Sequence, residues 1–310
     1  SWRDLGQELE RLGCDGIEGV WGGEDLPKDL PAELILGYHL IFYPDWLDFY
    51  RDDRAALKQK FGSLEAVASF YGGLGPDTLL EQYRADLRRA VNLGARYVVF
   101  HVSDVSLEEG YTYRWLPTNQ EVIDAAVEVV NLILGEERWP FEFLVENQWW
   151  PGFTFTEPEE TARLLEGIRF AGKGILLDTG HLMNACTELK TEAEGADYIR
   201  SMLNRHGSLA KWVRGVHLHQ SLSGAYVKAH TGSLPAGLPE DYMERFGVSY
   251  QHILQIDQHR PWTDPAILPV LEQIEPRYLT HELSSRGRMA RAEAVSIQTR
   301  LLRQGGRMRV

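Results

Sequence analysis

The chain has 310 residues and a mass of 35.3 kDa, 44% of its residues are hydrophobic, and its net charge is −13. This length and composition predict a globular protein with a full core, and no apolar run reaches the roughly 18 residues of a membrane span. The first residues lack a signal-peptide pattern, and Cys14 and Cys186 are too few for a disulfide framework. We therefore expect a cytoplasmic protein with no membrane partner.

The acidic charge argues against a long nucleic acid as the partner. Seven arginines and one glutamate lie in residues 286–310, so the rest of the chain carries about −19. Proteins that grip long nucleic acids usually present a basic stripe that neutralises phosphates. Residues 291–303 instead fit an amphipathic helix with a solvated basic face. We expect a small-molecule or nucleotide-like substrate, and the sequence leaves the oligomeric state open.

Strand-like apolar runs alternate with helix-like segments along the whole chain. A helix over residues 2–12 comes first and Gly13 closes it. Later helices are predicted to begin at Thr118, with Glu121 completing a capping box, and at Thr156. The predicted strands cover residues 16–21, 34–40, 96–102, 141–147, 174–178, 212–219 and 278–283.

Strict alternation of strands and helices predicts an α/β fold with a parallel sheet and right-handed crossovers. We favour a (β/α)₈ TIM barrel over an open doubly wound sheet, because no glycine-rich nucleotide-binding loop follows any strand. The barrel is predicted to be a single domain over residues 1–310, with elaborated loops at about residues 41–76 and 220–255. Since the chain begins with a helix, the first strand is expected to be missing or atypical.

Most of the predicted strands end in an acid or a histidine. The clearest example is an apolar run that closes with Asp178 and is followed three residues later by His181. An aspartate in this position can also be only the N-cap of the next helix. In a parallel barrel, however, all strand ends open into one bowl at the carboxyl face. The other residues of this kind are His39, His101, Glu146, His217 and Glu282.

So many acids and histidines in one bowl point to metal ions. Buried groups of this kind are too costly to desolvate unless cations compensate them, and mixed nitrogen and carboxylate donors are typical of zinc, manganese or iron sites. Asp257 and His259 add two candidates, which would share one face of an extended stretch. His219 lies on the same strand face as His217, and the sequence does not decide which of them is the ligand.

The order of these residues resembles the xylose isomerase-like barrels of AP endonuclease family 2, and most closely the endonuclease IV branch. The resemblance runs from about residue 13 to residue 282 and rests on spaced motifs. For the isomerase and epimerase branch it implies one metal ion, held by Glu146, Asp178, His217 and Glu282. Gln220, where the family often has an acid, and the long loop over residues 221–255 depart from the pattern.

For the endonuclease IV branch the resemblance implies three zinc ions. The first would be held by His39, His101 and Glu146. The second would share Glu146 and add the three remaining ligands of the isomerase site. The third would be held by His181, Asp257 and His259. Two or three zinc ions, or manganese, are therefore the expected cofactors.

The loops that follow these strands are rich in aromatic residues. Long loops bury aromatic side chains to pack themselves, but flat apolar walls also suit a nucleobase or another broad ring system. Arg260 and His219 are further candidates for substrate contacts. The aromatic candidates for substrate binding are Tyr43, Trp46, Trp149, Trp150 and Trp262.

These observations predict a metal-dependent hydrolase that cleaves a phosphodiester in a small or nucleotide-like substrate. The superfamily also contains corrinoid nucleotide-loop phosphodiesterases, which are a related possibility. The alternative is a sugar or keto-acid isomerase or epimerase that uses Glu146 and Glu282 as its catalytic acid and base. A binding protein without catalysis is the third hypothesis, and it requires the carboxylates to be stable without metal.

Overall fold

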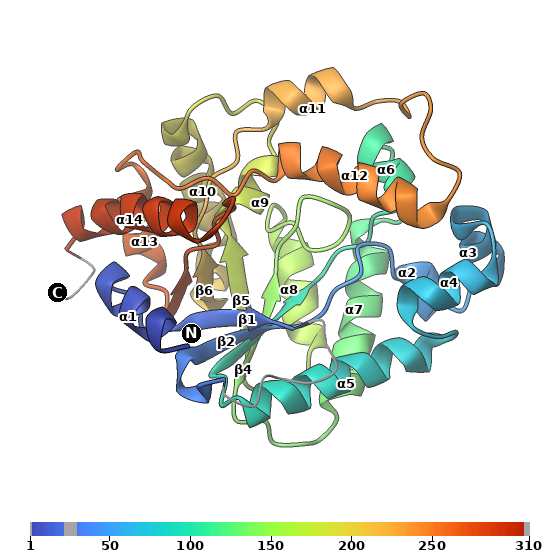
Figure 1. Ribbon diagram of the computed structural model, residues 1–310, viewed down its shortest axis with the longest axis horizontal. Coiled ribbons are helices and arrows are strands. Elements are labelled where there is room, and N and C mark those ends of the chain that lie inside the picture. The colour runs from blue at the N-terminus through green and yellow to red at the C-terminus, as the bar shows by residue number, and fades with distance from the viewer. Residues whose placement is uncertain (1, 22–29, 307–310) are drawn as a thin grey trace.

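One parallel sheet forms the centre of the computed structural model, which describes residues 2–21 and 30–306 (Figure 1). Neighbouring strands pair in parallel in the order of the chain, so the sheet curves into a nearly closed barrel. The predicted α/β barrel and its strands are confirmed. The strands are β1 (Ile17–Val20), β2 (Ile35–His39), β3 (Tyr97–His101), β4 (Glu142–Glu146), β5 (Lys173–Asp178), β6 (Val213–His217) and β7 (Tyr278–Thr280).

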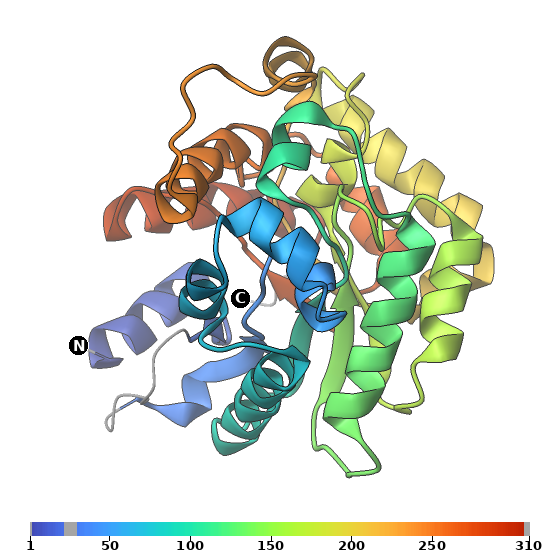
Figure 2. The ribbon, with the colours of Figure 1, turned by 90° about the vertical axis from the view of Figure 1, so that its right-hand side faces the viewer.

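Seven of the helices lie around the outside of the sheet, where α1 and α14 pack against each other beside the seam between the first and last strands (Figure 2). None of the helices in the described ranges is long and apolar enough to cross a membrane. The seven helices are α1 (Trp2–Leu12), α5 (Pro76–Asn92), α7 (Asn119–Leu134), α8 (Pro158–Gly167), α10 (Glu192–His206), α13 (Ile267–Ile274) and α14 (Arg288–Gln304).

The other helices fill the two elaborated loops and the strand ends. Among these, α12 contacts both α6 and α11, and the three lie together beyond the carboxyl ends of the strands (Figure 1). They are α2 (Leu47–Tyr50), α3 (Arg54–Phe61), α4 (Leu64–Tyr71), α6 (Leu107–Thr112), α9 (Thr179–Asn184), α11 (Gly224–His230) and α12 (Tyr242–Ile256), with 3₁₀ turns at Ala32–Leu34 and Gly207–Trp212.

The helix starts show where capping rules succeed and fail. Thr118 caps α7, and the side chain of Glu121 returns the bond to the backbone N–H of Thr118, as predicted. The predicted start at Thr156 is wrong: the N-cap of α8 is Glu157 and the helix begins at Pro158. The Thr156 hydroxyl instead bonds the hydroxyl of Thr154 at 2.7 Å, so it is engaged outside the helix.

The inside of the barrel is filled by every second side chain along the strands. Tyr97, Val99, Leu144 and Leu176 form a separate buried cluster, against which Tyr278 packs. The intervening residues of the same strands, such as Val98 and Phe143, pack outward into the main core against the helices. Alternation along each strand therefore divides the apolar residues between two cores.

The barrel departs from eight regular strands in the segment that carries Asp257 and His259. The sequence predicted an extended stretch there, but residues 253–256 belong to α12, whose buried residues Tyr242, Ser249, His252 and Ile256 keep helical spacing. As a result β6 pairs directly with β7. Among the described residues no backbone pairing joins β7 to β1, which takes the place of the first strand beside β2.

Gly37 on β2 is a test of how tightly the barrel is filled. A Cβ atom on Gly37 would lie 2.2 Å from the ring of Tyr97, whereas one on Gly19 of β1 would meet nothing closer than 3.9 Å. We expect Gly37→Ala to lower the free energy of unfolding by about 1 to 3 kcal/mol, because neither backbone nor ring can move freely. Gly19→Ala is the matched control and should be near neutral. Urea denaturation measures both, and equal stability of the two variants would contradict the packing described.

Candidate metal centre

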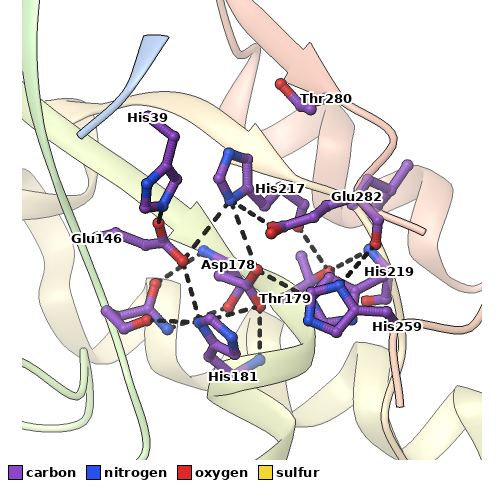
Figure 3. A network of polar contacts seen from close by, with 12 residues as sticks. His39, Glu146, Asp178, Thr179, His181, His217, His219, His259, Thr280 and Glu282 are labelled. Carbon is purple, nitrogen blue, oxygen red and sulfur yellow. Dashed lines mark hydrogen bonds and ion pairs between the residues drawn. The ribbon is translucent and has the colours of Figure 1, made fainter. Parts of the chain in front are cut away.

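All nine predicted ligands lie together at the carboxyl ends of the strands. Figure 3 labels all of them except His101 and Asp257. The strand register explains why they lie together, because His101 pairs with Glu146 and Asp178 pairs with His217, and each is the last residue of its strand. Their donor atoms form three groups, each of which could hold one metal ion. The groups are His39, His101 and Glu146; then Glu146, Asp178, His217 and Glu282; then His181, His219, Asp257 and His259.

The first group is nearly an equilateral triangle. His39 Nε2 lies 3.0 Å from His101 Nε2, and each nitrogen lies 3.3 Å from Glu146 Oε2. Zinc–nitrogen bonds near 2.05 Å in a tetrahedron place neighbouring donors roughly 3.3 Å apart. His39 donates its Nδ1–H to the carbonyl of Leu40 at 2.8 Å, which leaves the Nε2 lone pair free for an ion.

The second group surrounds His217 with carboxylates. His217 Nδ1 lies 2.6 Å from Glu282 Oε2, 3.6 Å from Glu146 Oε1 and 3.7 Å from Asp178 Oδ2. Burial would lower the pKa of His217, but the surrounding carboxylates, with Glu18 first among them, hold it well above its usual range. Asp178 is also the N-cap of α9, since it accepts the backbone N–H of His181 at 2.6 Å. Asp178 can therefore be both the N-cap of α9 and a candidate metal ligand.

The third group lies over the end of α12. Asp257 Oδ2 lies 2.6 Å from His259 Nε2 and 3.3 Å from His181 Nε2. Each of these histidines donates its Nδ1–H to a backbone carbonyl at 3.0 Å, His181 to Asn147 and His259 to Glu282. Burial opposes the charge of His259, yet Asp257 raises its pKa to about 9. His259 also adopts φ 46°, a left-handed conformation that non-glycine residues take at a cost and often at functional sites.

His217 and His219 differ in what they face. His219 Nε2 lies 2.9 Å from Asp178 Oδ2, and its ring stacks on His259 with centroids 4.0 Å apart and planes 5° apart. Because a ring nitrogen binds metal in the ring plane, two parallel stacked rings do not converge on one ion. The geometry favours His217 as a ligand and His219 as the partner that orients Asp178. A Cβ on Gly180 would lie 2.0 Å from the His219 ring, so glycine makes this packing possible.

The donor set fits metal ions. Several of its atoms are buried and make no hydrogen bond within the part of the chain that the structure describes, although opposite charges lie close by. A buried charged atom without a partner is destabilising, and metal ions held in the three groups would satisfy these atoms. These atoms are both carboxylate oxygens of Glu146, Nδ1 of His217, Oδ1 of Asp257 and Oε2 of Glu282.

The sequence analysis missed Glu18. This residue lies on β1 and both of its carboxylate oxygens are 3.0 Å from His217 Nε2, on the side of the ring that faces away from the second group. The available signal was a single acid in the strand Ile17–Val20, which alternation places toward the barrel interior.

A cavity of about 1630 Å³ opens over the three groups and continues to the seam between β1 and β7. Tyr43, Trp149 and Trp150 line it, as expected of substrate-facing residues. Two other predicted contacts need correction. Trp46 and Trp262 are 3% and 0% exposed and lie outside the cavity lining.

The indole N–H groups of those two residues explain their position. Trp46 donates to the carbonyl of Ser103 at 2.7 Å, and Trp262 donates to the carbonyl of His219 at 2.8 Å. Both tryptophans therefore hold loop backbone in place and do not face the cavity. Arg260 is exposed and also outside the lining, and its backbone pairs with Gln220.

Comparison with curated proteins finds no match. Similar solved structures include mannonate dehydratase from Streptococcus suis serotype 2, with 14% identity, 97% of this chain and 89% of that chain covered, and a TM-score of 0.53. Endonuclease IV from Thermus thermophilus shares 17% identity over 97% and 94% of the two chains, with a TM-score of 0.52. The model of the xylose isomerase-like TIM barrel family matches residues 7–275, and the chain therefore belongs to this family.

Proposed function

We propose that the protein is a metal-dependent hydrolase that cleaves a phosphodiester in a small or nucleotide-like substrate. The observation that carries the proposal is the position of Glu146, whose carboxylate belongs to two groups of donors at once, with a third group beside them. An isomerase or epimerase with one ion would need only the second group. The remaining donors would then have no metal role, and these are His39, His101, His181, Asp257 and His259.

Two or more ions that share a carboxylate would activate a water molecule and stabilise the attacking and leaving oxygens of an in-line displacement. The residues of the chain hold the donors in place for this. Backbone carbonyls accept the Nδ1–H groups of His39, His181 and His259, which fixes each ring with Nε2 toward the bowl. Trp149, 7% exposed, packs against His181 with the ring centroids 5.1 Å apart.

The donor types favour zinc for the first group and allow manganese in the second. Two imidazoles with one carboxylate, at edges of 3.0 and 3.3 Å, suit tetrahedral zinc. Three carboxylates with one imidazole also suit manganese. We therefore propose two or three zinc ions, or manganese, as the cofactors.

The second candidate function is a metal-dependent sugar or keto-acid isomerase or epimerase. Its support is the second group itself, because Glu146 and Glu282 both lie beside Nδ1 of His217 and could act as the acid and base of a proton transfer. One of the similar solved structures is an L-ribulose 3-epimerase, with 12% identity, 98% and 90% coverage and a TM-score of 0.50. This function uses one ion.

The number of metal ions bound per chain distinguishes the hydrolase from the isomerase or epimerase. Protein purified without chelator should hold about two to three ions per chain, measured by elemental mass spectrometry. His39→Ala should remove about one of them, because it breaks only the first group. A single ion in the wild type, unchanged in His39→Ala, would contradict the hydrolase and favour the epimerase.

Loss of His217 should abolish hydrolysis. In His217→Ala the rate on a chromogenic phosphodiester should fall by roughly 1,000-fold or more, since the second group loses its only nitrogen donor. Circular dichroism should show that the variant is folded. The matched control is His230→Ala, an exposed histidine on α11 outside the bowl, which should keep full activity. Equal rates in both variants would refute the assignment.

Trp149 should recognise the nucleoside part of the substrate. In Trp149→Ala, KM for the 4-nitrophenyl ester of thymidine 5′-phosphate should rise about 5- to 150-fold. This range corresponds to the free energy of stacking one base on an aromatic ring. KM for methyl 4-nitrophenyl phosphate, which has the same leaving group and no nucleoside, should change little. Trp139→Ala is the control, because Trp139 precedes β4 at the opposite end of the barrel. An equal rise for both esters would rule out nucleoside recognition.

A further inference from the structure

The first strand of the barrel carries a carboxylate that the proposed chemistry leaves without a role. Glu18 reaches from β1 into the barrel, where its side chain is 8% exposed and faces His217 on β6. We propose that Glu18 is a positioning residue, which fixes the tautomer and the orientation of His217 for metal binding. The inference rests on the proposed function, because it concerns the second group of donors at the same site.

The two nitrogens of His217 face opposite surroundings. Nε2 lies 3.0 Å from both oxygens of Glu18, and Nδ1 lies 2.6 Å from Glu282 Oε2 on the side of the bowl. A neutral imidazole carries one N–H, and a carboxylate at Nε2 holds the proton there. His217 then presents the lone pair of Nδ1 to an ion. The carboxylate also makes the imidazole a stronger donor.

Glu18 is itself held in one place. The hydroxyl of Tyr97 on β3 donates to Glu18 Oε2 at 2.8 Å, and the hydroxyl of Thr280 on β7 donates to the same oxygen at 3.3 Å. The two hydroxyl groups lie 3.0 Å from each other. Tyr97 can enter the barrel only because residue 37 is a glycine. Four strands therefore contribute to one buried arrangement beneath His217.

Two other roles for Glu18 fit less well. None of the three groups of donor atoms in the described residues contains Glu18, and the His217 ring separates it from the second group, so it is not a direct ligand. A purely structural role is the stronger alternative, since the contacts of Glu18 with Thr280 link β1 to β7 where no backbone pairing was found. The test must therefore separate an effect on the metal ligand from an effect on stability.

The test compares Glu18→Gln with Glu142→Gln. Glutamine keeps the size of the side chain but removes the charge that holds the proton on Nε2. Glu142 on β4 is the matched control, because its carboxylate pairs with Arg214 and Arg277 away from the bowl. Titration with Co²⁺, followed by its visible absorption, measures metal affinity. Nitrogen-15 NMR of histidine in metal-free protein, recorded at a pH high enough to make His217 neutral, reports the tautomer of His217.

We expect Glu18→Gln to weaken the binding of one Co²⁺ ion by about 10- to 100-fold and to mix the tautomers of His217, while Glu142→Gln changes neither. A lower melting temperature with unchanged affinity and tautomer would overturn the inference and leave Glu18 a structural role. Wild-type protein that binds no Co²⁺ would overturn it as well. Co²⁺ binding that depends on Glu18, in a protein that cleaves no phosphodiester, would support the inference and contradict only the hydrolase.

Discussion

Glu146 is fully buried at the end of β4, and four histidines surround its carboxylate at 3.1 to 3.6 Å. Burial disfavours its charge, but His101 and His217 hold its pKa well below the usual range. Without metal, the charge of Glu146 has to be balanced by protons on these rings. Metal ions would replace those protons, because an imidazole binds metal only in its neutral form. Proton and metal binding in the bowl therefore compete, and the state of each group depends on its neighbours.

The open seam between β1 and β7 affects the same site. A regular barrel would join these strands by backbone hydrogen bonds, whereas here α1 and α14 cover the outside (Figure 2). Inside, the side chains of Glu18, Tyr97 and Thr280 connect the strands. The seam is also where the cavity leaves the bowl. The side chains that connect β1 to β7 are thus the ones that contact or support Glu18 beside His217, so the proposed metal binding would be coupled to stability through them.

The sequence was most informative where a local pattern corresponds to a local structure. Apolar runs that end in an acid or histidine indicated the strands and the ends that face the bowl, as at Asp178. The grouping of distant residues such as His39 and His259 came from family resemblance, because the spacing of residues along the chain does not measure distance in the fold. The interpretation of these groups as metal sites is still a prediction.

The wrong predictions, and the residue that the sequence analysis missed, also have physical causes. Residues 253–256 form an apolar run that fits a strand, but the buried positions of α12 extend over about four turns and the longer helical pattern decides. Trp46 and Trp262 could not be distinguished from Trp149 by sequence. A tryptophan in a loop gives the same sequence signal whether it packs against the core or contacts a substrate. Glu18 was overlooked because its importance depends on His217, and the sequence does not show that His217 on β6 lies opposite Glu18.

The cover over the bowl limits what can reach the three groups of donor atoms. Trp149 and Trp150 pack against Val105, and α11 and α12 complete this cluster through Val227 and Ile256. The cluster stands over the third group of donors, where Trp149 lies against His181. A rigid duplex needs an open face for both strands, whereas a small diester or a single nucleotide can enter beneath the cover. The shape of the bowl and the acidic charge of the chain therefore favour the same class of substrate.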